Sequence, residues 1–250
     1  MSIEIQNLNL YIKGAHILKN INLVLPEKQI TCIIGPSGCG KSTLLRTMNR
    51  LIDSTEGLKI EGRVMVDNED IISSGSEITE LRRKIGLVSQ RPCPLPMSIF
   101  DNVAYGCRIN NMFKKRKELI RHVQENLKAV GLMDEIRGRM RSPAARLSIG
   151  QQQRLCLARS LAVRPEYILA DEATSALDPI SSKTVEDLFV SLKNNYSIIM
   201  VTHTLRQALR VADNVVFMYM GEVIETGPAS EFFENPKQEL TKKYLSGAFS

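Results

Sequence analysis

The chain has 250 residues, of which 43% are apolar, and a formal net charge of +6 at pH 7. This length and apolar content suffice to bury a substantial core and favour one large α/β domain. No apolar run approaches the roughly 18 to 20 residues of a membrane span, and the start, Met1-Ser2-Ile3-Glu4-Ile5, lacks the pattern of a secretory signal, so we expect a soluble intracellular protein. The five cysteines include no Cys-x-x-Cys pair, which argues against a disulfide framework or a zinc site.

Apolar and polar residues alternate between residues 3 and 25, and Pro26-Glu27-Lys28 is a turn signal. This pattern predicts antiparallel strands. Residues 29–34 then form a short buried-strand candidate, a glycine-rich segment follows, and residues 41–51 carry apolar side chains at helical spacing. A strand, a loop and a helix are therefore predicted in that order.

Further along, the pattern predicts a helical segment inserted into a sheet. Strands are expected at residues 64–66 and 85–88, whereas residues 99–163 are mostly helical in pattern. Strands and helices then alternate again, which predicts a largely parallel sheet. The expected elements are the strand 167–170, the helix 181–194, the strand 198–201, the helix 205–211, the strand 215–219 and short helices after Gly227.

A phosphate-binding loop lies between the predicted strand 29–34 and the predicted helix 41–51. Its residues fit the pattern G-x-x-x-x-G-K-[ST] and are Gly35, Pro36, Ser37, Gly38, Cys39, Gly40, Lys41, Ser42 and Thr43. The glycines allow backbone N–H groups to surround phosphate oxygens, and the N-terminus of the helix favours the same anion. We expect Lys41 to reach the β- and γ-phosphates and Ser42 to ligate Mg²⁺. The loop alone indicates a nucleoside triphosphate and does not separate kinases, GTPases and ATPases.

Two carboxylates follow the apolar run of residues 167–170. Asp171 and Glu172 therefore lie at the carboxyl end of a predicted parallel strand, where α/β sheets bind ligands. Asp171 is suited to hold Mg²⁺, and Glu172 is suited to accept a proton from an attacking water. An ordinary exposed acidic turn is the alternative, and the presence of the phosphate loop disfavours it.

Basic residues at 114–117 and the arginines at 137, 139, 141 and 146 raise the question of a nucleic-acid partner. No aromatic residues are interleaved with them to stack bases, so we interpret the first run as a solvated helix start and expect no nucleic-acid partner. His16 and His122 lack acidic or cysteine partners at metal spacing, and we interpret them as surface or packing residues.

The segment Leu147-Ser148-Ile149-Gly150-Gln151 resembles the Leu-Ser-Gly-Gly-Gln signature of the ABC ATPase family, which precedes a helix. Other positions of that family follow in order. Gln90 is similar to its Q-loop glutamine, Ser175-Ala176-Leu177-Asp178 to its D-loop, and His203 to its switch histidine. The resemblance implies a P-loop NTPase (RecA-like) α/β core with a mostly parallel sheet, an N-terminal antiparallel β subdomain and an inserted α-helical subdomain.

The expected organisation is a single domain over residues 1–250. We expect its nucleotide-binding core at residues 1–90 and 164–227, the helical subdomain that carries the signature at 91–163, and a helical tail at 228–250.

The same resemblance implies that ATP and Mg²⁺ bind between two copies of the chain. ATP binding would close a head-to-tail homodimer, in which each ATP contacts the phosphate loop of one copy and Ser148, Gly150 and Gln151 of the other. Gln90 would contact Mg²⁺ and, with His203, the γ-phosphate, and Asp178 would line the dimer contact. Apart from the resemblance, Gly150 can open a helix whose N–H groups favour an anion, while a simple N-cap is the alternative explanation of Ser148.

Over nearly the whole chain, the sequence is similar to the ATP-binding subunits of phosphate importers. The similarity is carried by residues 34–47, 94–104 and 175–181, of which Pro94-Leu95-Pro96-Met97-Ser98-Ile99 is the most discriminating segment. It implies phosphate uptake by a peripheral subunit at the cytoplasmic face of the cell membrane. The implied partners are two transmembrane permease subunits, which dock near Gln90 to Asn102, and an extracytoplasmic solute-binding protein.

Two other functions are alternatives. An importer of another solute would differ only in its membrane partners, so the motifs leave that alternative open. An ABC protein that acts on DNA or ribosomes would ordinarily carry two fused ATPase halves or a long coiled-coil insertion, and neither is present in 250 residues.

Three positions depart from the family pattern. Ile149 replaces a glycine of the signature, where a positive φ would be costly for a β-branched side chain. Ala173 replaces the proline that usually follows the glutamate, which removes a rigid φ. Ile12 stands where an aromatic residue usually stacks on adenine, and its neighbour Tyr11 faces the opposite side of the strand unless the register shifts, so both are candidates for the adenine contact.

Overall fold

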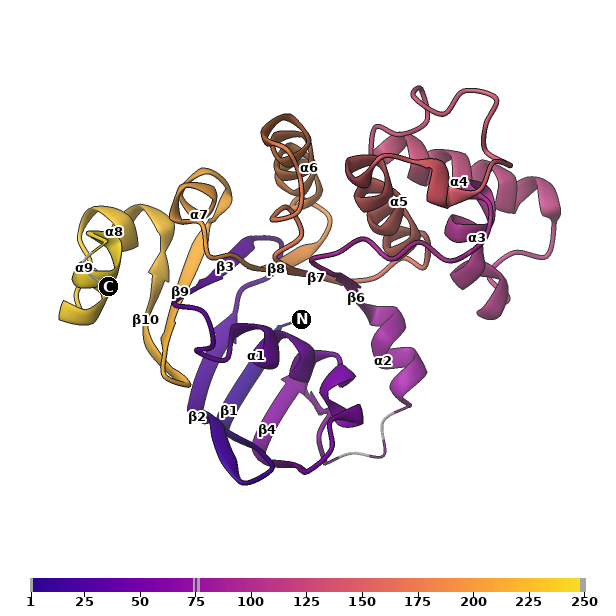
Figure 1. Cartoon of the computed structure of the whole chain (residues 1–250). Coiled ribbons are helices and arrows are strands. Elements are labelled where there is room, and N and C mark those ends of the chain that lie inside the picture. The colour runs from indigo at the N-terminus through magenta and orange to yellow at the C-terminus, as the bar shows by residue number, and fades with distance from the viewer. Residues whose placement is uncertain (1, 74, 76, 248–250) are drawn as a thin grey trace.

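Residues 2–73, 75 and 77–247 are described by a computed structural model, and two β-sheets organise them (Figure 1). The first sheet has four antiparallel strands in the order β2–β1–β4–β5. Its strands are β1 (Ile3–Ile12), β2 (Ala15–Leu25), β4 (Leu58–Val66) and β5 (Glu69–Asp70). The antiparallel strands predicted from the alternation at the start of the chain are therefore confirmed.

The second sheet has six strands in the order β10–β9–β3–β8–β7–β6. Neighbouring strands are parallel except for β10, which pairs antiparallel with β9. The strands are β3 (Ile30–Ile34), β6 (Ile85–Val88), β7 (Tyr167–Asp171), β8 (Ser197–Val201), β9 (Asn214–Tyr219) and β10 (Glu222–Pro228). A mostly parallel sheet beside a separate antiparallel sheet confirms the predicted α/β fold class.

Both faces of the six-stranded sheet are covered by other parts of the chain. Successive side chains of a strand point to opposite faces, and on β3 they pack into two different apolar clusters. On β3, Ile30, Cys32 and Ile34 belong to one apolar cluster, whereas Ile33 belongs to the other. The first cluster includes residues of the helices on one face, and the second includes residues of α1 and of the four-stranded sheet. The helices that contribute residues to these clusters include α1 (Lys41–Met48), α5 (Ile149–Ala162), α6 (Pro179–Leu192) and α7 (Leu205–Val211).

The helical insert projects beside β6 and β7 (Figure 1). It contains α3 (Ile99–Ile109), α4 (Arg116–Ala129), the short 3-10 helix η2 (Ala144–Arg146) and α5. Ser98 begins α3 as an N-cap, since its hydroxyl accepts a hydrogen bond from the Asp101 backbone N–H at 3.0 Å. Both α3 and α4 pack against α5, and this packing orients the start of α5.

The remaining helices are η1 (Leu51–Ser54), α2 (Ile78–Lys84), α8 (Ala229–Glu234) and α9 (Glu239–Leu245). The last two form the predicted helical tail beside β9 and β10 (Figure 1). Within the described part of the chain, every helix is too short or too polar to cross a membrane. Residues 1, 74, 76 and 248–250, which fall inside the predicted divisions 1–90 and 228–250, lie outside the described residues.

Several elements differ from the prediction, among them β4, β10 and α6. β4 begins at Leu58 rather than residue 64, because backbone pairing with β1 continues through polar, exposed positions. β10 was not predicted, since its side chains are mostly half-exposed and its hairpin turn uses Met220 at a positive φ of 48° in place of the usual Asn or Asp. α6 begins at Pro179 rather than residue 181, because Asp178 caps it.

The register of the parallel strands brings four strand ends to one edge of the sheet. Asp171 of β7 is level with Val201 of β8, which is level with Ile33 of β3, and Val88 of β6 is level with Ala170 of β7. The loops that leave this edge contain the phosphate loop, Gln90, Glu172 and His203.

Gly62 of β4 lies opposite an irregularity in β1 and has a φ of +94°, and a Cβ at this position would overlap the carbonyl oxygen of Asn7. We expect Gly62→Ala to lower the free energy of unfolding by about 1–3 kcal/mol, because alanine adds both backbone strain and steric overlap. Gly14→Ala is the matched control, with a φ of +85° but no atom within 4 Å of its Cβ. Urea unfolding followed by circular dichroism measures both variants, and equal losses would contradict the steric explanation.

Candidate functional site

The phosphate loop joins β3 to α1 through a backbone that requires glycine. Gly35, Gly38 and Gly40 have φ values of 148°, 79° and 100°, and a Cβ on Gly35 would overlap the carbonyl oxygen of Met218. Gly40 is the N-cap of α1 and supplies no side-chain cap to the helix. The first N–H groups of α1 therefore stay available to an anion such as a phosphate group.

Lys41 is 5% exposed, and its ammonium group folds back onto the phosphate loop. Its Nζ donates hydrogen bonds to the carbonyl oxygens of Gly35 and Pro36, each at 2.8 Å. Cys39 lies alongside, and burial raises the pKa of its thiol despite the nearby Lys41 charge. The loop therefore holds one buried positive charge at its centre, with a neutral thiol beside it.

Ser42 and Asp171 meet across the sheet edge, as their strand ends predict. The Ser42 hydroxyl donates to Asp171 Oδ1 at 2.6 Å, and the Arg46 guanidinium contacts Asp171 Oδ2 at 3.1 Å. A hydroxyl and a carboxylate are hard oxygen donors of the kind that Mg²⁺ prefers. Arg46 was not among the predicted residues, although its position one helical turn after Ser42 is the signal for a shared helix face.

Glu172 is held in an uncommon backbone conformation directly after Asp171. Its φ is +49°, in the left-handed region, where a non-glycine residue is strained. Its backbone N–H donates to the Val201 carbonyl at 3.0 Å, and its carbonyl accepts from the Ser175 N–H at 3.0 Å. The strained turn directs the carboxylate toward the loops that follow β6 and β8.

Gln90 and His203 both contact that carboxylate. Gln90 Nε2 donates to Glu172 Oε2 at 3.1 Å, and His203 Nδ1 lies 3.3 Å from the same oxygen. Within the described chain, Glu172 Oε1 has no such partner. Gln90 and His203, which lie more than a hundred positions apart in the sequence, thus converge on the Glu172 carboxylate, and one of its oxygens stays open.

The signature residues lie apart from this cluster within one copy of the chain. Ser148 and Gln151 form a capping box at the start of α5, in which each side chain bonds the other residue's backbone, at 3.3 and 3.1 Å. Gly150 packs closely on Ser181 of α6. Figure 1 shows α5 well separated from α1, so the structure does not bring Ser148, Gly150 and Gln151 to the phosphate loop of the same copy.

Ile149 does not suffer the predicted backbone strain. It is the first residue of α5 and is absent from the positive-φ positions among the described residues. Its side chain is 55% exposed, so it neither fills the core nor distorts the capping box. Ala173, the other substitution in the family pattern, is buried in the core.

Asp178 caps α6 with its side chain. Its Oδ1 accepts hydrogen bonds from the backbone N–H groups of Ile180 and Ser181, each at 3.0 Å. The hydrogen bonds from Ser181, followed by that of Ile180, hold the pKa of Asp178 below its usual value. The carboxylate therefore remains charged at the start of α6, on the same surface as the start of α5.

Tyr11 and Ile12 face opposite sides of β1, as strand geometry predicts. The Tyr11 ring stacks on the His16 ring with centroids 4.2 Å apart, and Lys59 Nζ lies 5.5 Å from its centroid. Ile12 instead packs against an apolar cluster that includes Cys39 of the phosphate loop, together with Leu18 and Leu44.

Comparison with known proteins gives consistent matches across the chain. A model of the ABC transporter family matches residues 18–175. The phosphate import ATP-binding protein PstB of Thermotoga maritima is 49% identical over 245 residues, which cover 98% of this chain and 97% of that protein. The protein of the same name from Thermococcus kodakarensis is 47% identical over 248 residues, which cover 99% and 98% of the two chains.

A solved structure agrees with these sequence matches. The cbiO1 protein of Clostridium perfringens, described as part of the ABC transporter complex cbiONQ, superposes with a TM-score of 0.80 at 31% identity and covers 97% of this chain and 94% of its own. The family model spans more than half of the chain, and the relatives match it nearly from end to end. The chain therefore belongs to the ABC transporter family, as one of its ATPases.

Proposed function

We propose that this chain hydrolyses ATP to drive the uptake of inorganic phosphate through membrane permease partners. The two relatives described above, which are 49% and 47% identical, are named phosphate import ATP-binding proteins. The observation that carries the chemistry is the Glu172 carboxylate, which lies between Gln90 and His203 at the edge of the sheet that also holds the phosphate loop.

The phosphate loop binds the triphosphate. The open N–H groups of α1 and the ammonium group of Lys41 meet the β- and γ-phosphates, and Lys41 exchanges its contacts with the Gly35 and Pro36 carbonyls for phosphate oxygens. Ser37, Cys39 and Thr43 complete the loop with their backbone groups. Because Lys41 is almost fully buried, its charge is screened little and favours a bound anion strongly.

Ser42 and Asp171, which meet at 2.6 Å, fit a Mg²⁺ site, and we assign Gln90 to it as a third ligand. Their hydroxyl, carboxylate and amide groups supply oxygen ligands. When no metal ion is bound, the Arg46 guanidinium neutralises the charge of Asp171. When bound, Mg²⁺ neutralises charge on the phosphate oxygens. The protein's own part is to hold the Ser42 hydroxyl and the Asp171 carboxylate at one point.

Glu172 accepts a proton from the water that attacks the γ-phosphate. Its open oxygen, Oε1, faces no competing donor in the described chain, while Gln90 and His203 hold Oε2. Gln90 and His203 also contact the γ-phosphate in this proposal. Glu172 is therefore positioned to accept a proton when ATP is bound. Hydrolysis then yields ADP and phosphate, with the proton on Glu172.

The active unit is a head-to-tail homodimer that closes on ATP. Because Ser148, Gly150 and Gln151 lie far from the phosphate loop of their own copy, a second copy is the source of a signature contact. The starts of α5 and α6 carry two exposed apolar side chains, Ile149 and Ile180, together with Asp178. These groups are suited to line the dimer contact.

The segment from Gln90 to Asn102 receives the permease subunits. It is linked to α5, since Arg159 donates to the Cys93 carbonyl at 3.1 Å and Gln153 Nε2 donates at 2.9 Å to the carbonyl of Ser89, the residue directly before the segment. Movement of α5 on dimer closure is therefore transmitted to this segment. The subunit acts peripherally at the cytoplasmic face of the membrane. An extracytoplasmic solute-binding protein is a further partner in the complex. Residues 91–163 move as a helical subdomain relative to residues 1–90 and 164–227.

Glu172→Gln removes the proton acceptor while it keeps the size and hydrogen-bonding shape of the side chain. We expect the turnover of ATP to fall by about 10²–10⁴-fold, ATP binding to persist, and a closed dimer to accumulate with ATP and Mg²⁺. Steady-state hydrolysis and size-exclusion chromatography measure these effects. Glu222→Gln, at an exposed position on β10, is the control. Near-normal hydrolysis by Glu172→Gln would refute the role of Glu172.

Phosphate as the solute is tested by uptake. We expect radiolabelled phosphate to enter cells that carry the chain with its permease partners, and to be lost in cells carrying the Glu172→Gln variant, because uptake is driven by hydrolysis. Transport of a different solute, with phosphate uptake unchanged by the variant, would favour the alternative importer.

Ile12 contacts adenine in this proposal, and Tyr11 does not. Ile12 packs against the apolar cluster that includes Cys39 of the phosphate loop, whereas the Tyr11 ring is occupied by His16 and Lys59. We expect Ile12→Ala to weaken ATP binding by about three- to tenfold through lost apolar contact, and Ile12→Tyr to strengthen it by stacking. Tyr11→Ala is the matched control and should bind as the unmodified chain does. Fluorescent nucleotide titration measures all three, and a loss confined to Tyr11→Ala would reverse the assignment.

A further inference from the structure

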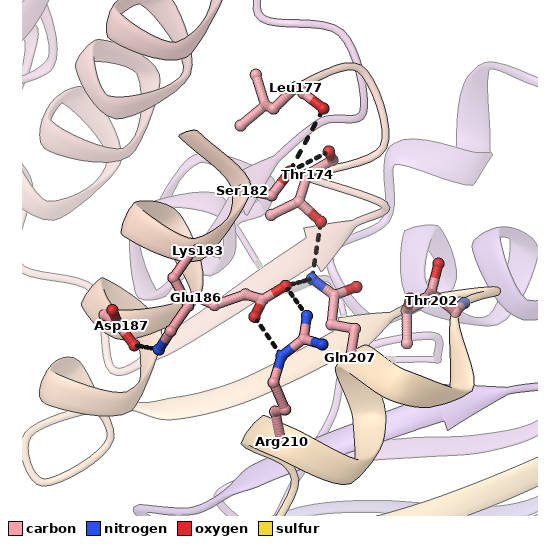
Figure 2. Close-up of polar contacts among 10 residues, drawn as sticks. Thr174, Leu177, Ser182, Lys183, Glu186, Asp187, Thr202, Gln207 and Arg210 are labelled. Atoms are coloured by element: carbon pink, nitrogen blue, oxygen red, sulfur yellow. Dashed lines mark hydrogen bonds and ion pairs between the residues drawn. The ribbon is translucent and has the colours of Figure 1, made fainter. Parts of the chain in front are cut away.

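A buried polar cluster lies behind the turn that joins Glu172 to Asp178. Figure 2 shows its members, Thr174, Glu186, Gln207 and Arg210, directed toward one another from the turn, α6 and α7. The first three are 9%, 3% and 4% exposed. The proposed hydrolysis assigns no role to any of them.

The cluster is connected through one carboxylate and one amide. Arg210 donates to both oxygens of Glu186, at 3.0 and 2.8 Å, in a bidentate pair. Gln207 Nε2 donates to Glu186 Oε1 at 3.1 Å and to Thr174 Oγ1 at 2.7 Å. The Gln207 amide thus bridges the charged pair to the turn, as the dashed lines in Figure 2 show.

Thr174 lies at the centre of the turn. Its carbonyl accepts hydrogen bonds from the Leu177 N–H at 3.1 Å and from the Ser182 hydroxyl at 3.2 Å. Glu172 is only two residues before it, and Asp178 is four residues after it. A displacement of Thr174 therefore displaces the strained backbone that orients the Glu172 carboxylate.

Gln207 occupies the first turn of α7, which follows His203 directly. Its backbone N–H donates to the Thr204 carbonyl at 3.0 Å, and Thr204 in turn donates to the Thr202 hydroxyl. The position of Gln207 is thereby tied to the loop that carries His203. The hydrogen bond from Gln207 to Thr174 therefore links the turn that follows Glu172 to the helix that follows His203.

Burial makes this link sensitive to position. Hydrogen bonds in a dry interior are stronger than in water, and their groups have no water to replace a lost partner. A shift of the turn relative to α7 would leave the Thr174 hydroxyl, the Gln207 amide or the Glu186 carboxylate without a partner. The cluster therefore favours one relative arrangement of the two loops.

We propose that Thr174, Gln207 and Glu186 are positioning residues that keep the Glu172 carboxylate and His203 in register during ATP hydrolysis. The inference rests on the proposed role of Glu172 as proton acceptor. Arg210 acts through Glu186, since it holds that carboxylate from the partly exposed side. None of these residues touches the nucleotide; they act through the turn and through α7.

The test compares two substitutions of one side chain. Thr174→Val keeps the shape and removes the hydroxyl, whereas Thr174→Ser keeps the hydroxyl. For Thr174→Val we expect kcat to fall roughly 10- to 100-fold with the KM for ATP little changed, because misplacement of a catalytic group by about 1 Å has an effect of this size. Thr174→Ser should restore most of kcat, which a purely space-filling role of the side chain would not produce.

Gln207→Met provides a second variant, which removes the amide at similar volume. The double variant of Thr174→Val and Gln207→Met should be no slower than the slower of the two single variants, since both substitutions break the Gln207–Thr174 hydrogen bond. In the Glu172→Gln background, Thr174→Val should cause no further loss of kcat. Circular dichroism and thermal unfolding verify that each variant is folded; should Thr174→Val fail to fold, Gln207→Met alone carries the kcat and KM comparison.

The outcomes separate this inference from the proposed function. If Glu172→Gln hydrolyses ATP normally, the role of Glu172 fails and the inference fails with it. If Glu172→Gln is inactive while Thr174→Val and Gln207→Met have unchanged kcat, the inference alone is overturned. A rise in the KM for ATP without a fall in kcat would also overturn it, because that result points to nucleotide binding.

Discussion

The in-register parallel pairing of β3, β8, β7 and β6 is the constraint on which the site depends. Parallel strands end at the same edge, so the phosphate loop after β3 and the carboxylates at the end of β7 face each other across β8 without any direct contact between their strands. The Ser42–Asp171 hydrogen bond of 2.6 Å spans this gap. A slip of one residue in either pairing would turn the side chains at these strand ends to the opposite face.

The same edge of the sheet includes a strained backbone conformation. Glu172 has a left-handed φ of 49°, which costs on the order of 1–3 kcal/mol for a non-glycine residue. The hydrogen bond from its N–H to Val201 and the buried cluster around Glu186 offset that cost from two directions. The Glu172 carboxylate is consequently oriented before any ligand arrives, and Gln90 and His203 meet it without rearrangement of the sheet.

Much of this arrangement was predictable because it follows short-range rules. The phosphate loop is specified by glycines whose φ values only glycine adopts easily, and Asp171 and Glu172 follow an apolar run that ends at the sheet edge. Arg46 and the Thr174–Gln207–Glu186 link could not be predicted with the same ease, since they depend on how α1, α6 and α7 are rotated about their axes. β10 was not predicted because its hairpin turn contains Met220 at a positive φ, and methionine is not a residue that indicates a turn.

In the proposed dimer, the start of α5 has both a local role, as a capped helix end, and an intermolecular role, as a phosphate contact. In one copy, the Ser148 hydroxyl and the Gln151 amide satisfy two backbone N–H groups at the start of α5, those of Gln151 and Ser148, and Gln151 also donates to Glu135 at 2.9 Å. A phosphate group that approached α5 from a second copy would therefore compete with the capping box for the same N–H groups. Since the Ser148 hydroxyl can rotate, the cap can be exchanged for a phosphate contact without unwinding the helix. Ile149, exposed beside it, lies on the surface that a second copy would cover and does not perturb the cap.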